Sequence, residues 1–172
     1  MGIRVISKGF SHSRMRKSVF RILRESMLCS MATVKGASRA HINTAFFAYS
    51  DQLEFYFLSD PRSIHCRNLS TNPSMAMTVF RSSQKWDESG RGLQLFGRCS
   101  EAKGSQATRA ETMYGKRFPA YAKWTRNRRQ ASLLRAYRFY RFIPNTAKVM
   151  DEEEYGGAVF LVAPVKKLIE RD

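Results

Sequence analysis

A polar turn that follows one of the apolar strand patterns carries side chains that suit an anion. It reads Ser59-Asp60-Pro61-Arg62-Ser63 and leads into a short helical pattern. Ser59 or Asp60 can cap that helix, and Pro61 suits its first turn. The first backbone N–H groups of a helix have no partner within it, so with the Arg62 fork and the Ser63 hydroxyl they can bind a phosphate. The turn predicts a phosphate site; the plainer alternative is an ordinary cap beside a surface arginine.

Other chemistry-bearing residues do not form a recognisable catalytic or metal motif. His65 adds a further donor or a neutral contact to the turn, but His12 and His41 do not pair with it at metal-ligand spacing. The sequence has no Gly-x-Ser-x-Gly, His-Glu-x-x-His or P-loop pattern. The acidic run at 151–154 is predicted as a solvated turn, because consecutive carboxylates do not converge on one ion. Three widely spaced cysteines indicate neither a disulfide framework nor a zinc site, and favour a reducing compartment.

The charge is strongly positive and unevenly placed. The net charge is +16 and the isoelectric point is near 10.3. No acidic residue occurs between Glu111 and Asp151, where the cations are Lys116, Arg117, Lys123, Arg126, Arg128, Arg129, Arg135, Arg138, Arg141 and Lys148. This basic block is either a solvated surface or a site for an anion. We favour a small anionic ligand over nucleic acid, because no zinc-finger, homeodomain or RNA-recognition pattern is present.

Periodicity predicts a mainly β chain with a few helices, which is typical of a barrel or sandwich. Apolar residues at helical spacing predict an amphipathic helix over about 13–27. Strands are predicted at about 28–35, 40–49, 53–58, 75–81, 93–99, 137–143, 148–150 and 158–162. Further helices are predicted at about 61–71, 105–114 and 126–136, with a last helical turn from 165. We expect one domain over 1–172, with the barrel at about 28–162.

Targeting signals are not evident in the sequence. The N-terminus lacks the apolar run of a signal peptide, and no window approaches the length of a membrane span. Ile6 stands where a myristoylation signal requires Ser or Thr. We therefore expect a cytoplasmic protein with no membrane partner.

Four segments, taken in order, resemble the pyridoxamine-5′-phosphate-oxidase-like, FMN-binding split-barrel family. They are 28–34 (LCSMATV), 41–47 (HINTAFF), 55–73 (from FYFLS to STNP) and 92–97 (GLQLFG). The segment 113–119 (MYGKRFP) is similar to an uncharacterised branch with a Tyr-x-x-Arg-Phe-Pro motif. The resemblance covers about 21–119. It implies a mainly β (α+β) fold, a six-stranded split β-barrel with Greek-key topology and flanking helices, which dimerises around two flavins.

The same resemblance implies a set of cofactor-binding residues. Arg62, Ser63 and His65 would contact the flavin phosphate, with Ser59 nearby. His65 stands where the oxidase proper has a lysine. The residues implied to line the isoalloxazine ring are Thr33, Val34, His41, Asn43 and Thr44, with Gln94 on a strand that approaches from the same subunit or its partner.

The resemblance fails at the substrate-recognition region. The oxidase proper carries an Arg-x-His pattern near its C-terminus, whereas residues 155–160 read YGGAVF here. Pyridoxamine phosphate is therefore not the expected substrate. We expect an FMN-dependent oxidoreductase, a homodimer, acting on a small organic anion. The alternatives are a reductase that uses a deazaflavin coenzyme on the same fold, and a non-catalytic flavin- or nucleic-acid-binding protein. No catalytic acid or base and no metal ligand is assigned.

Overall fold

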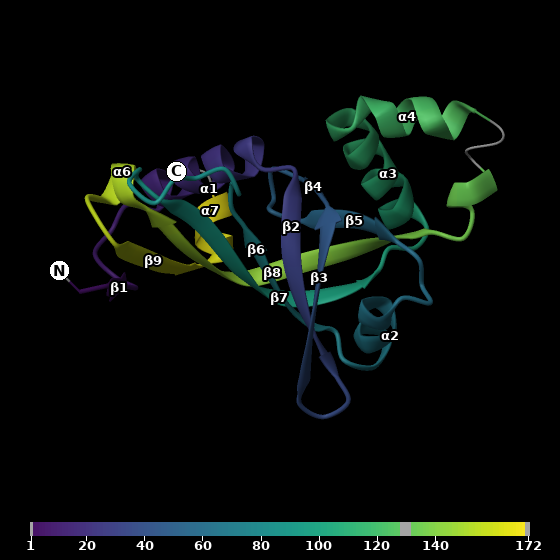
Figure 1. The fold of residues 1–172 in the computed structure, drawn as a ribbon, viewed down its shortest axis with the longest axis horizontal. Coiled ribbons are helices and arrows are strands. Elements are labelled where there is room, and N and C mark those ends of the chain that lie inside the picture. Colours follow the sequence, from purple (N-terminus) through teal and green to yellow (C-terminus); the bar gives the residue numbers. More distant parts are fainter. Residues whose placement is uncertain (1, 128–131, 171–172) are drawn as a thin grey trace.

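A curved, mixed β-sheet with helices packed against it forms the molecule (Figure 1). The structure is a computed structural model that describes residues 2–127 and 132–170. Within these residues nine strands pair, seven of them in the order β1-β9-β8-β7-β6-β2-β3, while β5 pairs with β8 and β4 with β5. The strands are β1 (Arg4–Ile6), β2 (Leu28–Lys35), β3 (Arg39–Phe46), β4 (Ala48–Tyr49), β5 (Phe55–Ser59), β6 (Ser74–Val79), β7 (Arg91–Glu101), β8 (Arg138–Asp151) and β9 (Val159–Pro164).

The mainly β class is confirmed, but the described residues form nine paired strands where six were expected, and β1 was not predicted. Two of the predicted strands also need correction. The predicted strand at 40–49 is two strands, β3 and β4, interrupted at the buried Phe47. The patterns at 137–143 and 148–150 are one strand, β8, which continues through Pro144. Pro144 lacks an N–H, and the β7–β8 register shifts between Phe96 and Gly97 at this point. A Cβ on Gly97 would lie 2.2 Å from the Ile143 carbonyl oxygen, so only glycine fits there.

The helices lie at the edges and ends of the sheet. They are α1 (His12–Glu25), α2 (Ile64–Thr71), α3 (Ser105–Arg117), α4 (Pro119–Arg126), α6 (Glu152–Tyr155) and α7 (Val165–Ile169). The prediction of a helix over 126–136 was wrong at its start, because Pro119 opens α4 earlier and that helix ends at Arg126. Residues 128–131 of the predicted stretch lie outside the described residues, and residues 132–134 are helical as predicted.

Two hydrophobic cores hold the sheet and helices together. In the larger one, α1 contributes side chains at helical spacing, including the fully buried Met15, Val19 and Leu23, which pack with the inward residues of β2, β6 and β7. The smaller core lies between β5, the start of β8 and the α3–α4 hairpin, and contains Tyr56 and Tyr114. The helical hairpin is thus fixed to the sheet through its own set of aromatic residues.

Arg117 connects the two cores. It lies in the last turn of α3, and its Nη2 donates to the carbonyl oxygens of Leu23 (2.7 Å) and Ser26 (2.6 Å) at the C-terminal end of α1. Its guanidinium also stacks 4.7 Å from the ring centre of Tyr49. The last carbonyls of a helix have no partner within it, so Arg117 acts as a side-chain cap supplied by another helix.

The acidic run at 151–154 is not a solvated turn. Asp151 is fully buried and lies 2.5 Å from Arg21 of α1, and Glu154 pairs with Arg14 at 2.8 Å. Glu153 pairs with Arg21 at 3.3 Å. These carboxylates therefore join α6 to α1. No group of residues able to hold a metal ion occurs in the described ranges, and no helix described there is long and apolar enough to cross a membrane.

Candidate functional site

The junction of β5 and α2 forms as a capped helix start, three residues later than the sequence suggests. The prediction that Ser59 or Asp60 caps the helix was wrong. The cap is Ser63, whose Oγ accepts from the Cys66 N–H, and α2 begins at Ile64. The Ser63 N–H in turn donates to the Asp60 carbonyl at 3.0 Å. Pro61 therefore belongs to the turn and not to the helix.

Three side chains converge at this junction. His65 Nε2 lies 2.7 Å from Ser59 Oγ and 3.2 Å from Ser63 Oγ, and the two hydroxyls are 3.5 Å apart. We call Ser59, Ser63 and His65 the histidine–serine cluster. The backbone N–H groups of Ile64 and His65 stand beside it and have no acceptor among the described residues. The cluster thus combines two hydroxyls, an imidazole and two free backbone donors.

β3 and β2 complete the surroundings of the cluster. The His41 ring stacks on the His65 ring with centres 6.4 Å apart and planes 8° apart. His41 is opposite Thr33 in the β2–β3 ladder, and the buried Thr33 Oγ1 accepts from Asn68 Nδ2 of α2 at 3.0 Å. This hydrogen bond fixes α2 against β2. Burial, and secondarily the nearby His41, lowers the pKa of His65, so its imidazole is neutral at pH 7.

Arg62 does not join the cluster. Its guanidinium forms a bidentate pair with Asp60, with Nη2 2.7 Å from Oδ2, and its side chain is 82% exposed. The hydrogen bonds from Arg62 lower the pKa of Asp60 to about 2, so the pair stays ionised. The turn is therefore locally neutral, and the cation that the sequence offers to a phosphate is already engaged.

The other predicted residues divide between two faces of the β2–β3 hairpin. Side chains alternate along a strand, and Thr33 is buried on the inner side while Val34 points outward. Asn43 lies on the inner side, and its buried Oδ1 has no hydrogen-bond partner. Thr44 and Gln94 lie on the opposite, outward side. The structure therefore brings His41 and Thr33 to the cluster and leaves Val34, Thr44 and Gln94 on another surface.

That surface is hollow and partly apolar. We call it the outer face; it is formed by the outward side chains of β3, β2, β6 and β7. A cavity of about 180 Å³ is lined there by Ser30, Ala32, Ile42, Ala76, Met77, Thr78, Gln94 and Phe96. Two of these apolar side chains are exposed, Ile42 by 70% and Phe96 by 43%. Small residues at alternate positions of β2 are the sequence signal that could have located this hollow.

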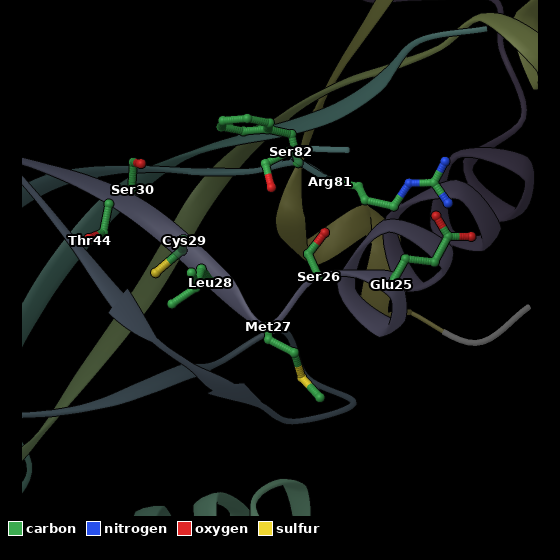
Figure 2. A pocket seen from close by; sticks show the side chains of 10 residues that line it. Glu25, Ser26, Met27, Leu28, Cys29, Ser30, Thr44, Arg81 and Ser82 are labelled. Carbon is green, nitrogen blue, oxygen red and sulfur yellow. The ribbon is translucent and has the colours of Figure 1, made fainter. Parts of the chain in front are cut away.

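A second cavity, of about 330 Å³, continues the hollow at the start of β2 (Figure 2). Ser30 lines both cavities. Ser30 and Thr44 lie at one end, and Glu25 and Arg81 at the other. Between them the walls are Met27, Leu28 and Phe80, about half exposed, with the buried Ser26, whose Oγ has no partner. Sequence reasoning found Thr44 here but missed Ser26 and Arg81, which come from loops with no motif.

The basic block does not form one site. Arg117 caps α1, Arg141 pairs with Glu54, and Lys148 Nζ lies 4.3 Å from the ring centre of Phe160. Arg138 donates to the carbonyls of residues 135 and 137. Arg128 and Arg129 lie outside the described residues. The remaining members, which are exposed and have no described carboxylate partner, are Lys116, Lys123, Arg126 and Arg135.

Solved structures share this fold at low sequence identity. The heme binding protein from Mycobacterium smegmatis superposes with a TM-score of 0.70 and 11% identity, over 95% of this chain but only 62% of that chain. A general stress protein 26-related protein of the pyridoxinephosphate oxidase family from Clostridium acetobutylicum has a TM-score of 0.67 and 8% identity, over 92% and 99% of the two chains. A FAD-binding protein from Mesorhizobium loti has a TM-score of 0.59 and 15% identity, over 77% and 91%.

These structural similarities establish the fold, and a sequence comparison establishes the family. No curated protein matches the chain in sequence. The family described as pyridoxamine 5′-phosphate oxidase matches residues 15–151, which include most of α1, the histidine–serine cluster and the outer face. The chain therefore belongs to the pyridoxamine 5′-phosphate oxidase family.

Proposed function

We propose that the protein binds FMN and acts as a flavin-dependent oxidoreductase on a small organic anion. The observation that supports this most directly is the histidine–serine cluster at the N-terminus of α2. Hydroxyls, an imidazole and the free N–H groups of Ile64 and His65 are the donors that a phosphate monoester requires. FAD binding by a protein of the same fold is consistent with this assignment.

The residues present fit the phosphate group, with a weaker charge than the oxidase proper would offer. Neutral His65 and the engaged Arg62 leave no free cation within the cluster. Binding therefore depends on hydrogen bonds, and a dianion placed there would favour protonated His65. The unpartnered Oδ1 of Asn43 gives a second point of fit, because a ribityl hydroxyl would satisfy it.

We place the ring system on the outer face, which requires a second copy of the chain. Val34, Thr44 and Gln94 lie there beside the exposed Ile42 and Phe96. Contiguous exposed apolar side chains are typical of interaction surfaces. A partner subunit that covers this face would enclose the cavities between two sheets. The homodimer therefore belongs to the same proposal.

The 330 Å³ cavity is the proposed substrate site. Its half-exposed Met27, Leu28 and Phe80 suit an apolar body, and Arg81 supplies a cation for an acidic group. The buried Ser26 hydroxyl offers a further polar contact. The flavin supplies the electron-transfer chemistry when bound. The side chains of this protein bind, orient and exclude water.

The first test is the absorption spectrum of the purified protein, followed by titration of the apoprotein with FMN. Flavin bands support the proposal. A single blue-shifted band would instead indicate a bound deazaflavin coenzyme. A Soret band would indicate bound heme. In the titration, Ser59→Ala combined with His65→Gln weakens FMN at least about tenfold, because two hydrogen bonds to a charged group are lost. Arg62→Ala, the control, changes the affinity less than about threefold, because Arg62 already pairs with Asp60. An unchanged affinity in the double variant would contradict the site.

A further inference from the structure

The helical hairpin α3–α4 presents cations and an aromatic ring to solvent, away from the proposed flavin site. Figure 1 shows it projecting beyond the sheet at the end opposite to β1 and β9. α4 has no buried residue. Its inward contacts are made by Tyr121, whose ring centre lies 5.1 Å from Tyr114 and 6.0 Å from Phe139. The opposite side of α4 therefore has no partner within the described chain.

The exposed charged and aromatic residues of α4 are Lys123, Trp124 and Arg126. Trp124 is 47% exposed and directly follows Lys123, and neither cation has a described carboxylate partner. Burial, and next the nearby Glu111 carboxylate of α3, raise the pKa of Tyr121 to about 12, so Glu111 lies close to the inward side of α4. The positive charge on this side of the helix is thus uncompensated, and such a field attracts polyanions.

The residues that lead into β8 extend this surface. Phe139 packs on Tyr121, and the chain before β8 lies at the same end of the molecule as α4 (Figure 1). The Arg138 guanidinium donates to the Arg135 carbonyl at 2.6 Å and to the Tyr137 carbonyl at 2.8 Å, which fixes the turn. Tyr137 is 42% exposed. We call Lys123, Trp124, Arg126, Arg135 and Tyr137 the α4 surface.

We propose that the α4 surface binds single-stranded nucleic acid, a function distinct from flavin binding. Exposed aromatic rings together with unpaired cations match the stacked bases and phosphates of a single strand. These five residues line neither of the two cavities described above, so the α4 surface is separate from the proposed flavin and substrate sites. For this part of the basic block we therefore favour nucleic acid over the small anionic ligand expected from the sequence.

An anionic membrane is the competing partner, and the side chains favour it less. A helix that lies in a membrane surface inserts an apolar face. The apolar side of α4, with Tyr121 and Ala122, is already packed against α3 and β8. The exposed part of α4 offers a membrane one large apolar side chain, Trp124, next to the cation Lys123.

The test is fluorescence anisotropy of a labelled 15-nucleotide oligo(dT) with the full-length protein. We expect affinity to fall by roughly 20-fold between 50 and 200 mM salt, since three phosphate contacts at a slope of about 0.7 each act over a fourfold change. Lys123→Ala with Arg126→Ala lowers the salt slope by about 1.4 and weakens binding at least about tenfold. Lys8→Ala with Arg24→Ala removes the same charge from exposed positions elsewhere and changes binding less than about threefold.

Trp124→Ala tests stacking separately from charge, because the net charge is unchanged. We expect it to weaken oligo(dT) binding by roughly fivefold or more. Trp86→Ala is the matched control, because Trp86 is fully exposed in the loop between β6 and β7; its effect stays below about twofold. Equal losses in each variant and its control, or binding to phosphatidylglycerol vesicles without binding to oligo(dT), would overturn the proposal. The FMN titration does not involve the α4 surface. A negative result with oligo(dT) would therefore contradict nucleic-acid binding without bearing on the proposed flavin site.

Discussion

The two faces of the β2–β3 hairpin differ in almost every physical respect. On the inner side, Thr33 and His41 are covered by α2, and the Thr33 hydroxyl is paired with Asn68. On the outer side, Ile42 and Thr44 are exposed, next to the hollow that Phe96 helps to line. The same two strands build both, because successive side chains point to opposite faces.

One short element therefore serves two parts of one proposed site. The inner side is rigid and its hydrogen bonds are mostly satisfied, which suits the fixed geometry of a phosphate cradle. The outer side is open and apolar, which suits a surface completed by another chain. In this proposal the phosphate end of the flavin would be bound by one subunit and the ring end would depend on the dimer.

The largest expected effect follows from a charge on the outer face. Ile42→Asp raises the dimer dissociation constant at least roughly 100-fold, because an unpaired carboxylate would be buried between two sheets. Sedimentation equilibrium measures it. Ile3→Asp is the matched control, because Ile3 is 71% exposed and Ile42 is 70% exposed. If both variants dimerise like the wild type, or if the wild type is monomeric at micromolar concentration, the outer face is not the interface.

Substitutions on the inner face should lower the stability of the folded protein. Thr33→Val leaves the buried Asn68 amide without its acceptor and lowers the free energy of unfolding by about 1–3 kcal/mol. Thr44→Val makes the same change on the outward side of the neighbouring strand, where the effect stays within about 0.5 kcal/mol. Urea denaturation of both variants compares the two faces directly. Similar losses in both would show that the faces are not energetically distinct.

A smaller effect is expected on turnover at the outer face. Arg81→Ala raises KM for an anionic substrate by roughly threefold to tenfold, since an exposed charge-assisted contact is lost, while FMN affinity is unchanged. Steady-state kinetics with an acidic substrate and its neutral amide would measure this. Arg24→Ala serves as the control. If KM rises equally for the acidic substrate and its neutral amide, Arg81 does not recognise the acidic group.

The smallest effect is a pH dependence at the inner face. Burial lowers the pKa of His65 below its ordinary 6.5, so the unfolded chain binds that proton more readily than the folded chain. The contribution of the neutral His65 ring to the free energy of unfolding is therefore fully present above pH 6.5. It is lost as the pH falls toward the pKa of His65 in the folded protein. In thermal melts from roughly pH 8 to 5, His65→Gln should lose less stability than the wild type. His12→Gln, the control at an exposed position, should show the same pH dependence of stability as the wild type. If His65→Gln also shows the wild-type pH dependence, this explanation is wrong.

Much of the fold was predictable because periodicity reports burial. The alternation in β2 and the helical spacing in α1 correspond to the sides that pack in the core. The end of α1 was placed two residues too late, since Ser26 turns extended there and Met27 is 51% exposed. β1 was missed because three residues carry too little pattern, and it forms only by pairing with β9.

The candidate site was predictable in composition and less so in arrangement. Ser59, Ser63 and His65 were identified and lie within hydrogen-bond distance. The engagement of Arg62 by Asp60 depends on the turn conformation, which sequence patterns do not specify. Likewise the pairing of Arg141 with Glu54 joins residues 87 positions apart, so a run of cations in sequence was not a run of unpaired charges in space.

The bond from Arg117 to the end of α1 also has a consequence for the order of folding. α1 leaves the ribosome before α3 does, yet the donor for its last carbonyls lies 94 and 91 residues later in the chain. Until α3 has formed and docked, the C-terminal turn of α1 lacks this cap and frays. The last turn of α1 is therefore complete only when the α3–α4 hairpin has docked. We expect the amide hydrogens of residues 23–26 to become protected from exchange at the same time as the hairpin docks.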